Sequence, residues 1–422
     1  MKNILISILI LCGFYMAVTA RDKNNTLDSL VNLALQVSPK LKMLNYKYYA
    51  AKSRIEVNSN LPDPMLTLGL ANLPTNTFSF TQEPMTGKII GLSQAVPFPG
   101  KLSAVEDVAS KDVEIVQQEV DDSRNEIIKN VSQNYYELIY VRKAIDVANE
   151  NSKLLNEVAK VVRTNYSVAK ASQQNLFKVE LEITNLNDKI VELKNKENSL
   201  LAIINAQLLR KQDVPVYTDD LPSIKYYEYT QKQLDSMSVH NRPFLTGIEL
   251  AKQKAVLQEK LARYDFYPNF NFSIQYSQRD RIAATNMPLA DFASFFIGIS
   301  LPFNYGGKVS SKIEESEAMQ NMYNEQYNLS LQVLNSNFGS SVSKLNSLRE
   351  RIKLTEDAEL PQAQQTFSTS LSSYQVGQVD FINVIDAQSK LYQVETNLYR
   401  LKTDYLKEIE ELKFLTGSKD LK

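Results

Sequence analysis

The sequence predicts a mainly helical chain with four strands, built as two similar halves that each carry a strand pair and a long helical hairpin. Three observations lead to this prediction. Glycine is scarce, with 12 residues in 422, about 2.8 % against the usual ~7 %. The stretch from Lys101 to Asn165 contains neither proline nor glycine. Landmark residues recur in the same order roughly 205 positions apart, which indicates an internal repeat.

The composition excludes most kinds of catalytic and metal site. The chain has one histidine (His240), one cysteine (Cys12) and no tryptophan. A catalytic triad or a two-histidine metal site cannot be built from one histidine, and cysteine-ligated zinc needs several cysteines. No glycine-rich phosphate-binding motif occurs. We therefore expect no enzyme, no metal site and no cofactor. With 47 basic and 48 acidic residues, no basic excess points to nucleic acid.

The N-terminus predicts export. Lys2 precedes the apolar run Ile4–Leu11, and residues 18–20 read Val-Thr-Ala, which together describe a signal peptide over residues 1–20. Cleavage after Ala20 would leave a mature chain without cysteine. The alternative is a lipoprotein signal with Cys12 as the acylated residue, although the bulky Leu11 precedes it. After residue 20 no apolar run reaches the ~18 residues of a membrane helix.

Four pairs of landmarks define the two repeats. Their separations lie between 204 and 208 residues and keep the same order, which chance matches of proline and tyrosine would rarely do. The pairs are Pro39 and Pro243, Pro64 and Pro268, Pro97 and Pro302, and Tyr166 and Tyr374. We expect a first repeat over residues 21–211 and a second over residues 212–422. Residues 211–229 break the helical pattern and predict a linker that packs against the helices.

Strand pairs are expected at about residues 64–97 and 268–303, because apolar and polar residues alternate there with period two. The lengths match the 9–11 residues of a barrel strand in a membrane. One face of a soluble sandwich is the alternative, but four strands are few for so large a chain, which favours a barrel shared between subunits. The positions predicted to share the apolar, lipid-facing side are Leu66, Leu68, Leu70, Phe270, Phe272, Ile274, Ile297 and Ile299.

Helical hairpins are expected at about residues 101–209 and 308–415. The 65 residues from Lys101 to Asn165 give a helix of about 98 Å. Within it, twelve positions follow alternating steps of four and three, and ten of them are apolar, which is typical of a coiled-coil seam. In the second hairpin, Pro361 should bend the outward helix. The twelve seam positions are Ile127, Val131, Asn134, Leu138, Val141, Ile145, Ala148, Ser152, Leu155, Ala159, Val162 and Tyr166.

Two motifs carry a family resemblance. They are Ser-Gln-Ala-Val-Pro-Phe-Pro-Gly-Lys over residues 93–101 and Tyr-Gln-Val-Gly-Gln-Val-Asp-Phe-Ile-Asn-Val-Ile-Asp-Ala-Gln over residues 374–388. With the repeated organisation, they resemble the TolC-type outer-membrane efflux proteins, the outer membrane factors of tripartite export systems. The resemblance covers essentially the whole mature chain.

The resemblance implies a homotrimer in the bacterial outer membrane. Each subunit would give four strands to a 12-stranded β-barrel in contact with lipid, and its hairpins to an α-barrel projecting into the periplasm. Four strands alone would leave open edges in lipid, whereas three copies close a barrel. The implied function is an exit duct that passes substrate from an inner-membrane pump of the resistance-nodulation-division type and a periplasmic adaptor, a membrane fusion protein, to the exterior.

The resemblance also implies a periplasmic gate at the helical turns. Tyr374 matches the gate tyrosine, Gly377 the turn glycine and Asp386 an acidic-ring position. Asn383 stands where relatives often carry a second acidic residue, and Val379 where some carry a gate arginine.

The first turn carries no acidic residue that could pair with the second turn in a charged gate. Asn175 takes its place, beside Gln174, and Tyr166 precedes the turn. Closure is therefore expected to rest on Tyr374, on polar Gln174 and Asn175, and on packing. Ala169 occupies the position that corresponds to Gly377, and this predicts that the first turn differs from the second.

A second function remains open at this point. Most long coiled coils are structural, so the chain could be an exported soluble adaptor or scaffold. Periplasmic adaptors usually add modules rich in glycine and β-branched residues, whereas only four short strands are visible here. The strand pairs therefore favour the channel.

Overall fold

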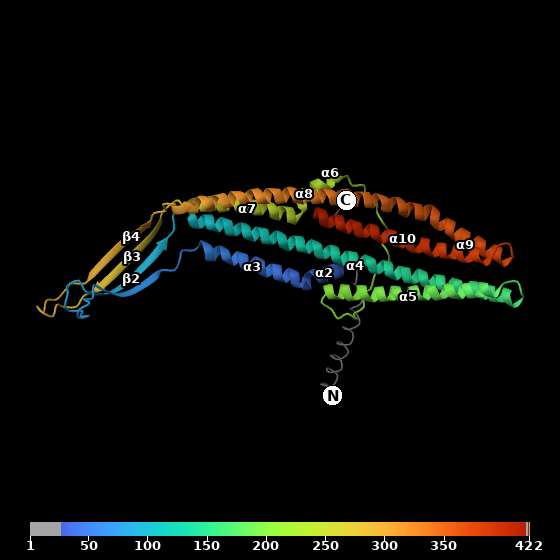
Figure 1. The fold of residues 1–422 in the computed structure, drawn as a ribbon, viewed down its shortest axis with the longest axis horizontal. Helices are drawn as coiled ribbons and strands as arrows, with labels where there is room; N and C mark the ends of the chain where they lie inside the picture. Colours follow the sequence, from blue (N-terminus) through green and yellow to red (C-terminus); the bar gives the residue numbers. More distant parts are fainter. Residues whose placement is uncertain (1–26, 419–420, 422) are drawn as a thin grey trace, which may run out of the picture. The chain divides into compact units, whose positions relative to one another are not determined.

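The computed structural model describes residues 27–418 and residue 421 (Figure 1). The signal peptide predicted at residues 1–20, and with it Cys12, lies outside the described residues. None of the described helices is both long and apolar enough to cross a membrane. In chain order the elements are α2 (Leu27–Val37), α3 (Pro39–Ser59), β1 (Met65–Ala71), β2 (Gly87–Val96), α4 (Lys101–Ser167), α5 (Gln173–Gln207), α6 (Gln231–Asn241), α7 (Pro243–Tyr264), β3 (Asn269–Gln278), β4 (Phe292–Ser300), the 3₁₀ turn η1 (Tyr305–Gly307), α8 (Lys308–Leu354), the π turn η2 (Thr355–Glu359), α9 (Leu360–Gln375) and α10 (Phe381–Thr416).

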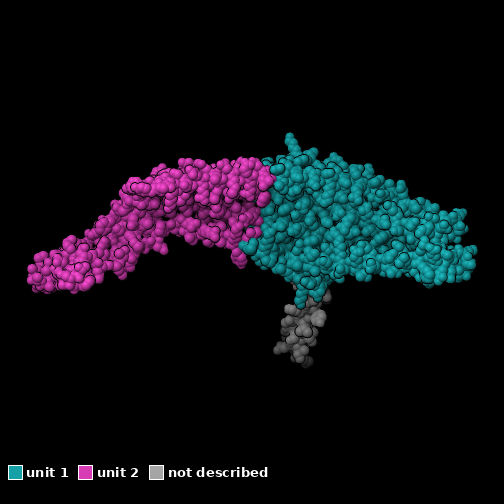
Figure 2. Space-filling model, viewed as in Figure 1, with its two compact units in different colours: residues 1–43, 120–243, 331–422 teal, residues 44–119, 244–330 magenta. Residues whose placement is uncertain are grey.

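The chain divides into two compact units (Figure 2). The first unit comprises residues 1–43, 120–243 and 331–422, and the second comprises residues 44–119 and 244–330. Each unit therefore draws on both halves of the sequence, and helices α4 and α8 contribute residues to both. The division of the sequence into repeats at residues 211 and 212 stays a prediction.

The four strands form one antiparallel sheet in the order β1-β2-β3-β4. The predicted strand pairs are thus present, and the ladder between β2 and β3 joins them. Leu66 lies opposite Leu92, Leu92 opposite Ile274, and Ile274 opposite Phe295. Because residues opposite one another in a ladder share a face, this register places all eight predicted apolar positions on the same side. Within the described chain, β1 and β4 each have a single neighbour.

The sheet ends in a tightly built strand-to-helix junction that explains the Pro-Phe-Pro-Gly-Lys motif. Gly100 has φ +87°, and a Cβ there would lie 2.8 Å from the Tyr264 hydroxyl, so only glycine fits. The next residue, Lys101, places its Nζ 2.7 Å from Oδ1 of Asp265. Lys312 of α8 binds the other oxygen of the same carboxylate. One aspartate therefore ties together the starts of α4 and α8.

Helix α4 buries more of its surface than the predicted seam. Eight of the twelve seam positions are buried, whereas Ile127, Asn134, Ser152 and Tyr166 are not. A second buried stripe runs beside the first, because α4 packs against α10 as well as against α5. The single-seam prediction is incomplete for this reason. The second stripe contains Tyr135, Ile139, Ala144, Val147, Asn151 and Val158.

The outward helix of the second hairpin is interrupted where a bend was predicted. Helix α8 ends at Leu354, a π turn follows over Thr355–Glu359, and Pro361 lies in the first turn of α9. Proline lacks an N–H donor, and its ring crowds the carbonyl of the residue four positions earlier, here Asp357. The π turn widens the backbone at that point.

The linker between the hairpins packs against the helices, as predicted. Val216 is 1 % exposed and belongs to the apolar cluster around α4. Arg142 donates a hydrogen bond to Thr218 Oγ1 at 2.9 Å, and the Asp219 N–H donates to the Tyr135 hydroxyl at 2.9 Å. These contacts fasten the segment to α4.

A single carboxylate joins three helices of the first unit. Glu137 of α4 accepts hydrogen bonds from Lys196 of α5 at 2.6 Å, and from Arg400 and Lys407 of α10 at 2.8 Å and 2.9 Å. Burial alone would raise the pKa of Glu137, but the hydrogen bonds from Arg400, Lys196 and Lys407 outweigh it and lower the pKa to about 2. The Glu137 carboxylate is therefore ionised in the folded protein at any pH well above 2.

We predict that Glu137→Gln lowers the free energy of unfolding at pH 7 by about 2–3 kcal/mol, because three cations lose their shared partner. A lowered pKa contributes stability that is complete above the ordinary carboxyl value of 4.5 and is lost as the pH falls toward 2. Denaturant titration at pH 7 and pH 3 should show a smaller difference between the two proteins at pH 3. Glu157→Gln, at an exposed pair, should change stability little at either pH. Equal losses for Glu137→Gln at both pH values would contradict the assignment.

Candidate functional site

The two helical tips, where α4 meets α5 and α9 meets α10, have the same backbone. Ala169 has φ +59° and Gly377 has φ +77°. The Ala169 N–H donates to the Tyr166 carbonyl and the Gly377 N–H to the Tyr374 carbonyl, both at 3.0 Å. The expectation that Ala169 makes the first turn different is therefore wrong at the level of the backbone. Alanine is held in the left-handed conformation that glycine adopts at the second tip.

The likeness of the tips extends to the start of the returning helices. Ser172 and Asp380 precede α5 and α10 with extended backbones. The Asn175 N–H donates to the Ser172 carbonyl, and the Asn383 N–H to the Asp380 carbonyl, both at 3.1 Å. All of these positions are 208 residues apart. The sequence repeat is thus a structural repeat at its tips.

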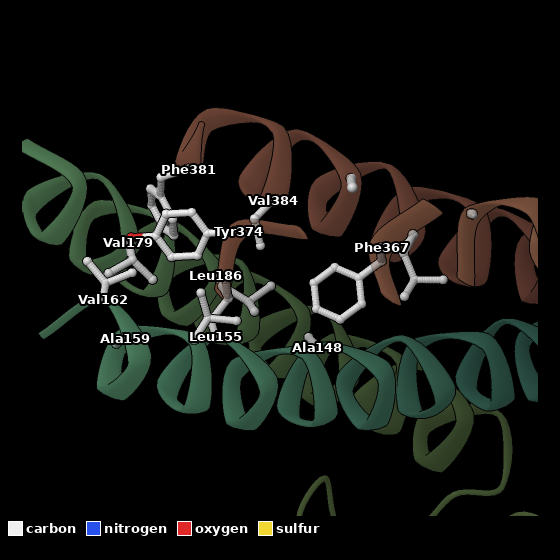
Figure 3. Close-up of a cluster of buried hydrophobic side chains, with 14 of the residues drawn as sticks. Ala148, Leu155, Ala159, Val162, Val179, Leu186, Phe367, Tyr374, Phe381 and Val384 are labelled. Atoms are coloured by element: carbon white, nitrogen blue, oxygen red, sulfur yellow. The ribbon is translucent and has the colours of Figure 1, made fainter. Parts of the chain in front are cut away.

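Tyr374 lies inside the second tip rather than on its surface. Its side chain is 7 % exposed, and its ring packs against that of Phe381 with centroids 5.3 Å apart. The surrounding cluster draws on both hairpins, with Val162 of α4 and Val179 of α5 close to the ring (Figure 3). Its hydroxyl is buried and has no hydrogen-bond partner among the described residues. The tyrosine therefore joins the two hairpins by packing.

The other predicted tip residues are spread over the surface. Tyr166 is 44 % exposed, Asn175 is half-buried, and Gln174, Gly377, Asn383 and Asp386 are exposed. No ion pair or hydrogen bond joins residues 160–180 of the first tip to residues 370–390 of the second tip, and the structure describes all of these residues. Apolar packing alone holds the tips together in this conformation. The roles of these residues in a gate stay predictions.

A polar group that the sequence reasoning missed lies deeper in the same core. Gln388 of α10 donates a hydrogen bond to Asn151 Oδ1 at 3.0 Å, and Asn151 Nδ2 donates to Glu395 at 3.2 Å. Burial raises the pKa of Glu395, with a further rise from the nearby Glu150 carboxylate and a partial reduction from the Asn151 hydrogen bond. The sequence signal that could have identified this group is Asn151 itself. It is a polar residue in the second buried stripe of α4, which the predicted single seam did not include.

The sheet exposes one strongly apolar face. Phe295 is 76 % exposed, Leu68 70 % and Ile297 67 %, and the rows of the ladder place them on the same side. The opposite side of β3 carries Asn269, Asn271, Ser273, Gln275 and Ser277. A contiguous exposed apolar surface of this kind marks a face that contacts lipid or protein. The lipid contact itself stays a prediction.

Residues 236–418 match the model of the outer membrane efflux protein family. Among characterised proteins, the chain is similar to the outer membrane efflux protein BepC of Brucella suis, with 20 % identity over 287 residues, which are 67 % of this chain and 61 % of BepC. It is 22 % identical over 304 residues to the cobalt-zinc-cadmium resistance protein CzcC of Cupriavidus metallidurans, covering 70 % of this chain and 68 % of CzcC. With the cation efflux system protein CusC of Escherichia coli it shares 21 % identity over 405 residues, covering 93 % and 86 %.

Solved structures share the fold over nearly the whole chain. The outer membrane protein VceC of Vibrio cholerae superimposes with a TM-score of 0.78 at 17 % identity, covering 93 % of this chain and 96 % of VceC. CusC superimposes with a TM-score of 0.77 at 18 % identity, covering 93 % and 92 %. At these identities the likeness establishes the fold. A mainly helical chain with one four-stranded antiparallel sheet is therefore the architecture of known outer-membrane channels.

We predict opposite effects for exchanging the two left-handed residues. Gly377→Ala should lower the free energy of unfolding by about 1 kcal/mol, because alanine is strained at positive φ, and nothing lies within 4 Å of the added Cβ. Ala169→Gly should raise stability by about 0.5–1 kcal/mol as it relieves the same strain. Thermal unfolding of the purified variants measures both, and a less stable Ala169→Gly protein would refute the shared geometry.

We predict that Tyr374→Phe raises the free energy of unfolding by about 1 kcal/mol, because a buried hydroxyl without a partner is removed and the ring is kept. Tyr374→Ala should lower it by about 3–5 kcal/mol through loss of packing. The same unfolding assay compares them. A Tyr374→Phe protein that unfolds more easily than the parent would show that the hydroxyl does have a partner.

Proposed function

We propose that this chain, a member of the outer membrane efflux protein family, is one subunit of a trimeric outer-membrane channel that serves as the exit duct of a tripartite export system. The observation that supports this most directly is the sheet. It combines an exposed apolar face with two edge strands, β1 and β4, that each have one open side in the described chain.

The open edges call for further copies of the same sheet. In lipid, every backbone N–H and C=O needs an internal partner, so a four-stranded sheet cannot stand alone there. Three copies, each pairing β4 with β1 of the next, give a closed barrel of 12 strands. A barrel of that size leaves a lumen rather than a packed core. The apolar face with Phe295 and Ile297 then contacts lipid, and the serine and asparagine face of β3 lines water.

The helices supply the periplasmic part. The hairpins α4–α5 and α9–α10 from three subunits are proposed to form an α-barrel that projects from the outer membrane into the periplasm. Their tips would meet a periplasmic adaptor, and through it an inner-membrane pump of the resistance-nodulation-division type. The chain itself needs no catalytic residue for this task. Since CzcC is named for cobalt, zinc and cadmium resistance and CusC for cation efflux, metal cations are the first cargo to test.

Asp386 is proposed to tune the entrance. Its side chain is exposed on α10, one turn beyond the exposed Asn383. In a trimer three copies of this carboxylate would face one constriction, and a ring of negative charge favours cations. Tyr374, buried against Phe381 in the tip, would hold the tip closed through packing.

We predict that the protein is extracted from envelopes only with detergent and migrates as a trimer that heating dissociates. Closure of a barrel by three subunits is the physical reason, because each subunit then completes the edges of its neighbours. Light scattering of the purified protein gives the mass. A monodisperse monomer released by wash buffer would refute the channel and would favour the soluble adaptor or scaffold.

In planar bilayers we predict that multivalent cations block the channel and that Asp386→Ala weakens this block by about tenfold, because three charges leave the constriction together. Conductance is measured at increasing concentrations of a trivalent cation. Glu157→Ala, which removes an exposed carboxylate whose partner is Lys160, serves as the control and should leave the block unchanged. An unaltered block in Asp386→Ala would exclude the charged ring while leaving the channel itself intact.

A further inference from the structure

Two phenylalanines of β4 lie on the polar side of the sheet, which the proposed function assigns to the water-filled lumen. The ladder places Phe296 opposite Ser273 and Phe292 opposite Ser277. Both rings therefore share the serine side of β3, whereas the neighbouring Phe295 lies on the apolar side. Phe296 is 54 % exposed and Phe292 is 43 % exposed. Alternation with period two would place a polar residue at each of these two positions.

The rest of this side is small and uncharged. We call it the polar face, and it consists of the strand residues that share a side with Ser273. The one charged residue of the four strands, Lys88, lies opposite Leu70 and so belongs to the apolar side. Cargo that moves along the polar face therefore meets no charged strand residue, and the two rings are its largest side chains. The polar face comprises Met65, Thr67, Gly69, Ala71, Gly87, Ile89, Gly91, Ser93, Ala95, Asn269, Asn271, Ser273, Gln275, Ser277, Phe292, Ser294, Phe296, Gly298 and Ser300.

The ring of Phe292 already holds a cation. The guanidinium carbon of Arg279 lies 3.5 Å from the centroid of this ring, which is a cation–π contact. Arg279 is fixed there by two hydrogen bonds, because its Nε donates to the Ala290 carbonyl at 2.7 Å and its Nη1 to the Pro84 carbonyl at 3.0 Å. The polar face thus binds a flat cation through an aromatic ring at one position.

The ring of Phe296 has no such partner. No cation of the described chain lies over it. Its neighbours on the polar face are small, namely Ser294 and Gly298 along β4 and Ser273 across the ladder. Side chains of this size leave the ring open to water on the side of its own subunit.

A depression of about 530 Å³ opens on the polar face close to this ring. Its lining includes Ser93, which stands in the same ladder row as Phe296, and Gly298, the next residue of the face along β4. Asp63, which precedes β1, contributes the one charged group of the lining. A carboxylate and an aromatic ring both attract positive charge, and the glycine leaves room for a flat body.

We propose that Phe296 forms a subsite in the channel lumen for organic cations with a flat, apolar body, through the same contact that Phe292 makes with Arg279. The subsite rests on the trimeric channel proposed above, in which three copies of this ring face one lumen. It selects by the apolar surface of the cation, whereas the ring of charge proposed at Asp386 selects by charge alone.

Conductance block by methyl viologen, a flat aromatic dication, tests the subsite in planar bilayers. The dication of 1,4-diaminobutane carries the same charge on two hydrated ammonium groups, so the ratio of the two half-blocking concentrations separates the aromatic contact from the effect of Asp386. In the parent, methyl viologen should block at about fivefold lower concentration. Phe296→Leu should bring the ratio to about one, because leucine keeps the apolar bulk and removes the π-electrons. An unchanged ratio in Phe296→Leu would overturn the subsite.

The same substitution at the neighbouring residue is the matched control. Phe295 lies on the apolar side of the sheet, and leucine keeps that side apolar, so Phe295→Leu should block with the ratio of the parent. An equal loss of preference in Phe295→Leu would also overturn the subsite, because a general change in the barrel would then account for both results.

Thiol labelling separates a failure of the subsite from a failure of the channel. Cys12 is the one cysteine of the sequence and lies in the predicted signal peptide, so Phe296→Cys and Phe295→Cys each add a single thiol to the mature chain. In proteoliposomes, a charged methanethiosulfonate should modify Phe296→Cys at least tenfold faster than Phe295→Cys. Equal rates would overturn the channel, because both sides of the sheet would then face water. Faster modification of Phe296→Cys together with an unchanged block ratio in Phe296→Leu would leave the channel standing and exclude the subsite.

Discussion

The pairing of β2 with β3 is the interaction on which the second unit depends. Strands β1 and β2, like β3 and β4, form a two-stranded hairpin, and such a hairpin is marginal alone. The ladder places Val96 opposite Phe270, so the chain leaving β2 meets the chain arriving from α7. There Phe98 stacks on Tyr267 with ring centroids 4.5 Å apart, and Lys101 reaches Asp265. The start of α4 is therefore defined by strand pairing between residues far apart in the sequence.

In the first unit, α4 plays the equivalent part, because its two buried stripes serve two partner helices at once. A helix that packs on two sides has only a narrow face left for solvent, so some of its polar residues lie in the interior. Glu137 and Asn151 are the result, and each is satisfied by residues of α10. Buried polar groups of this kind favour one alignment of neighbouring helices, since a shift of one turn would leave them without partners.

The sequence alone predicts the helices, the strands and their repetition, because these follow from the spacing of apolar, proline and glycine residues along the chain. Alternation over residues 269–277 predicted β3, and the absence of proline and glycine after Lys101 predicted α4. The failures have non-local causes. The contact of α4 with α10 joins Asn151 to Gln388, 237 residues apart, and no local period records it. Ala169 adopts a positive φ because the packed helices on both sides enforce the turn, whereas an alanine in the sequence predicts a negative φ. Tyr374 was identified at the tip, but its burial against Phe381 depends on the second hairpin.

One requirement, that polar groups find partners, connects the sheet with the helical seam. At the open edges of β1 and β4 the unpaired groups belong to the backbone, water is absent from lipid, and in the proposed trimer only another copy of the sheet can satisfy them. At Gln388 the unpaired oxygen belongs to a side chain, whose amide nitrogen donates a hydrogen bond to Asn151. The first situation favours permanent association, because separation would leave the edges unsatisfied. The second is tolerated inside the seam, because the hydrogen bonds of Asn151 to Gln388 and Glu395 remain formed around it. The same physical requirement therefore underlies both the association proposed for the sheet and the polar contacts within the helical seam.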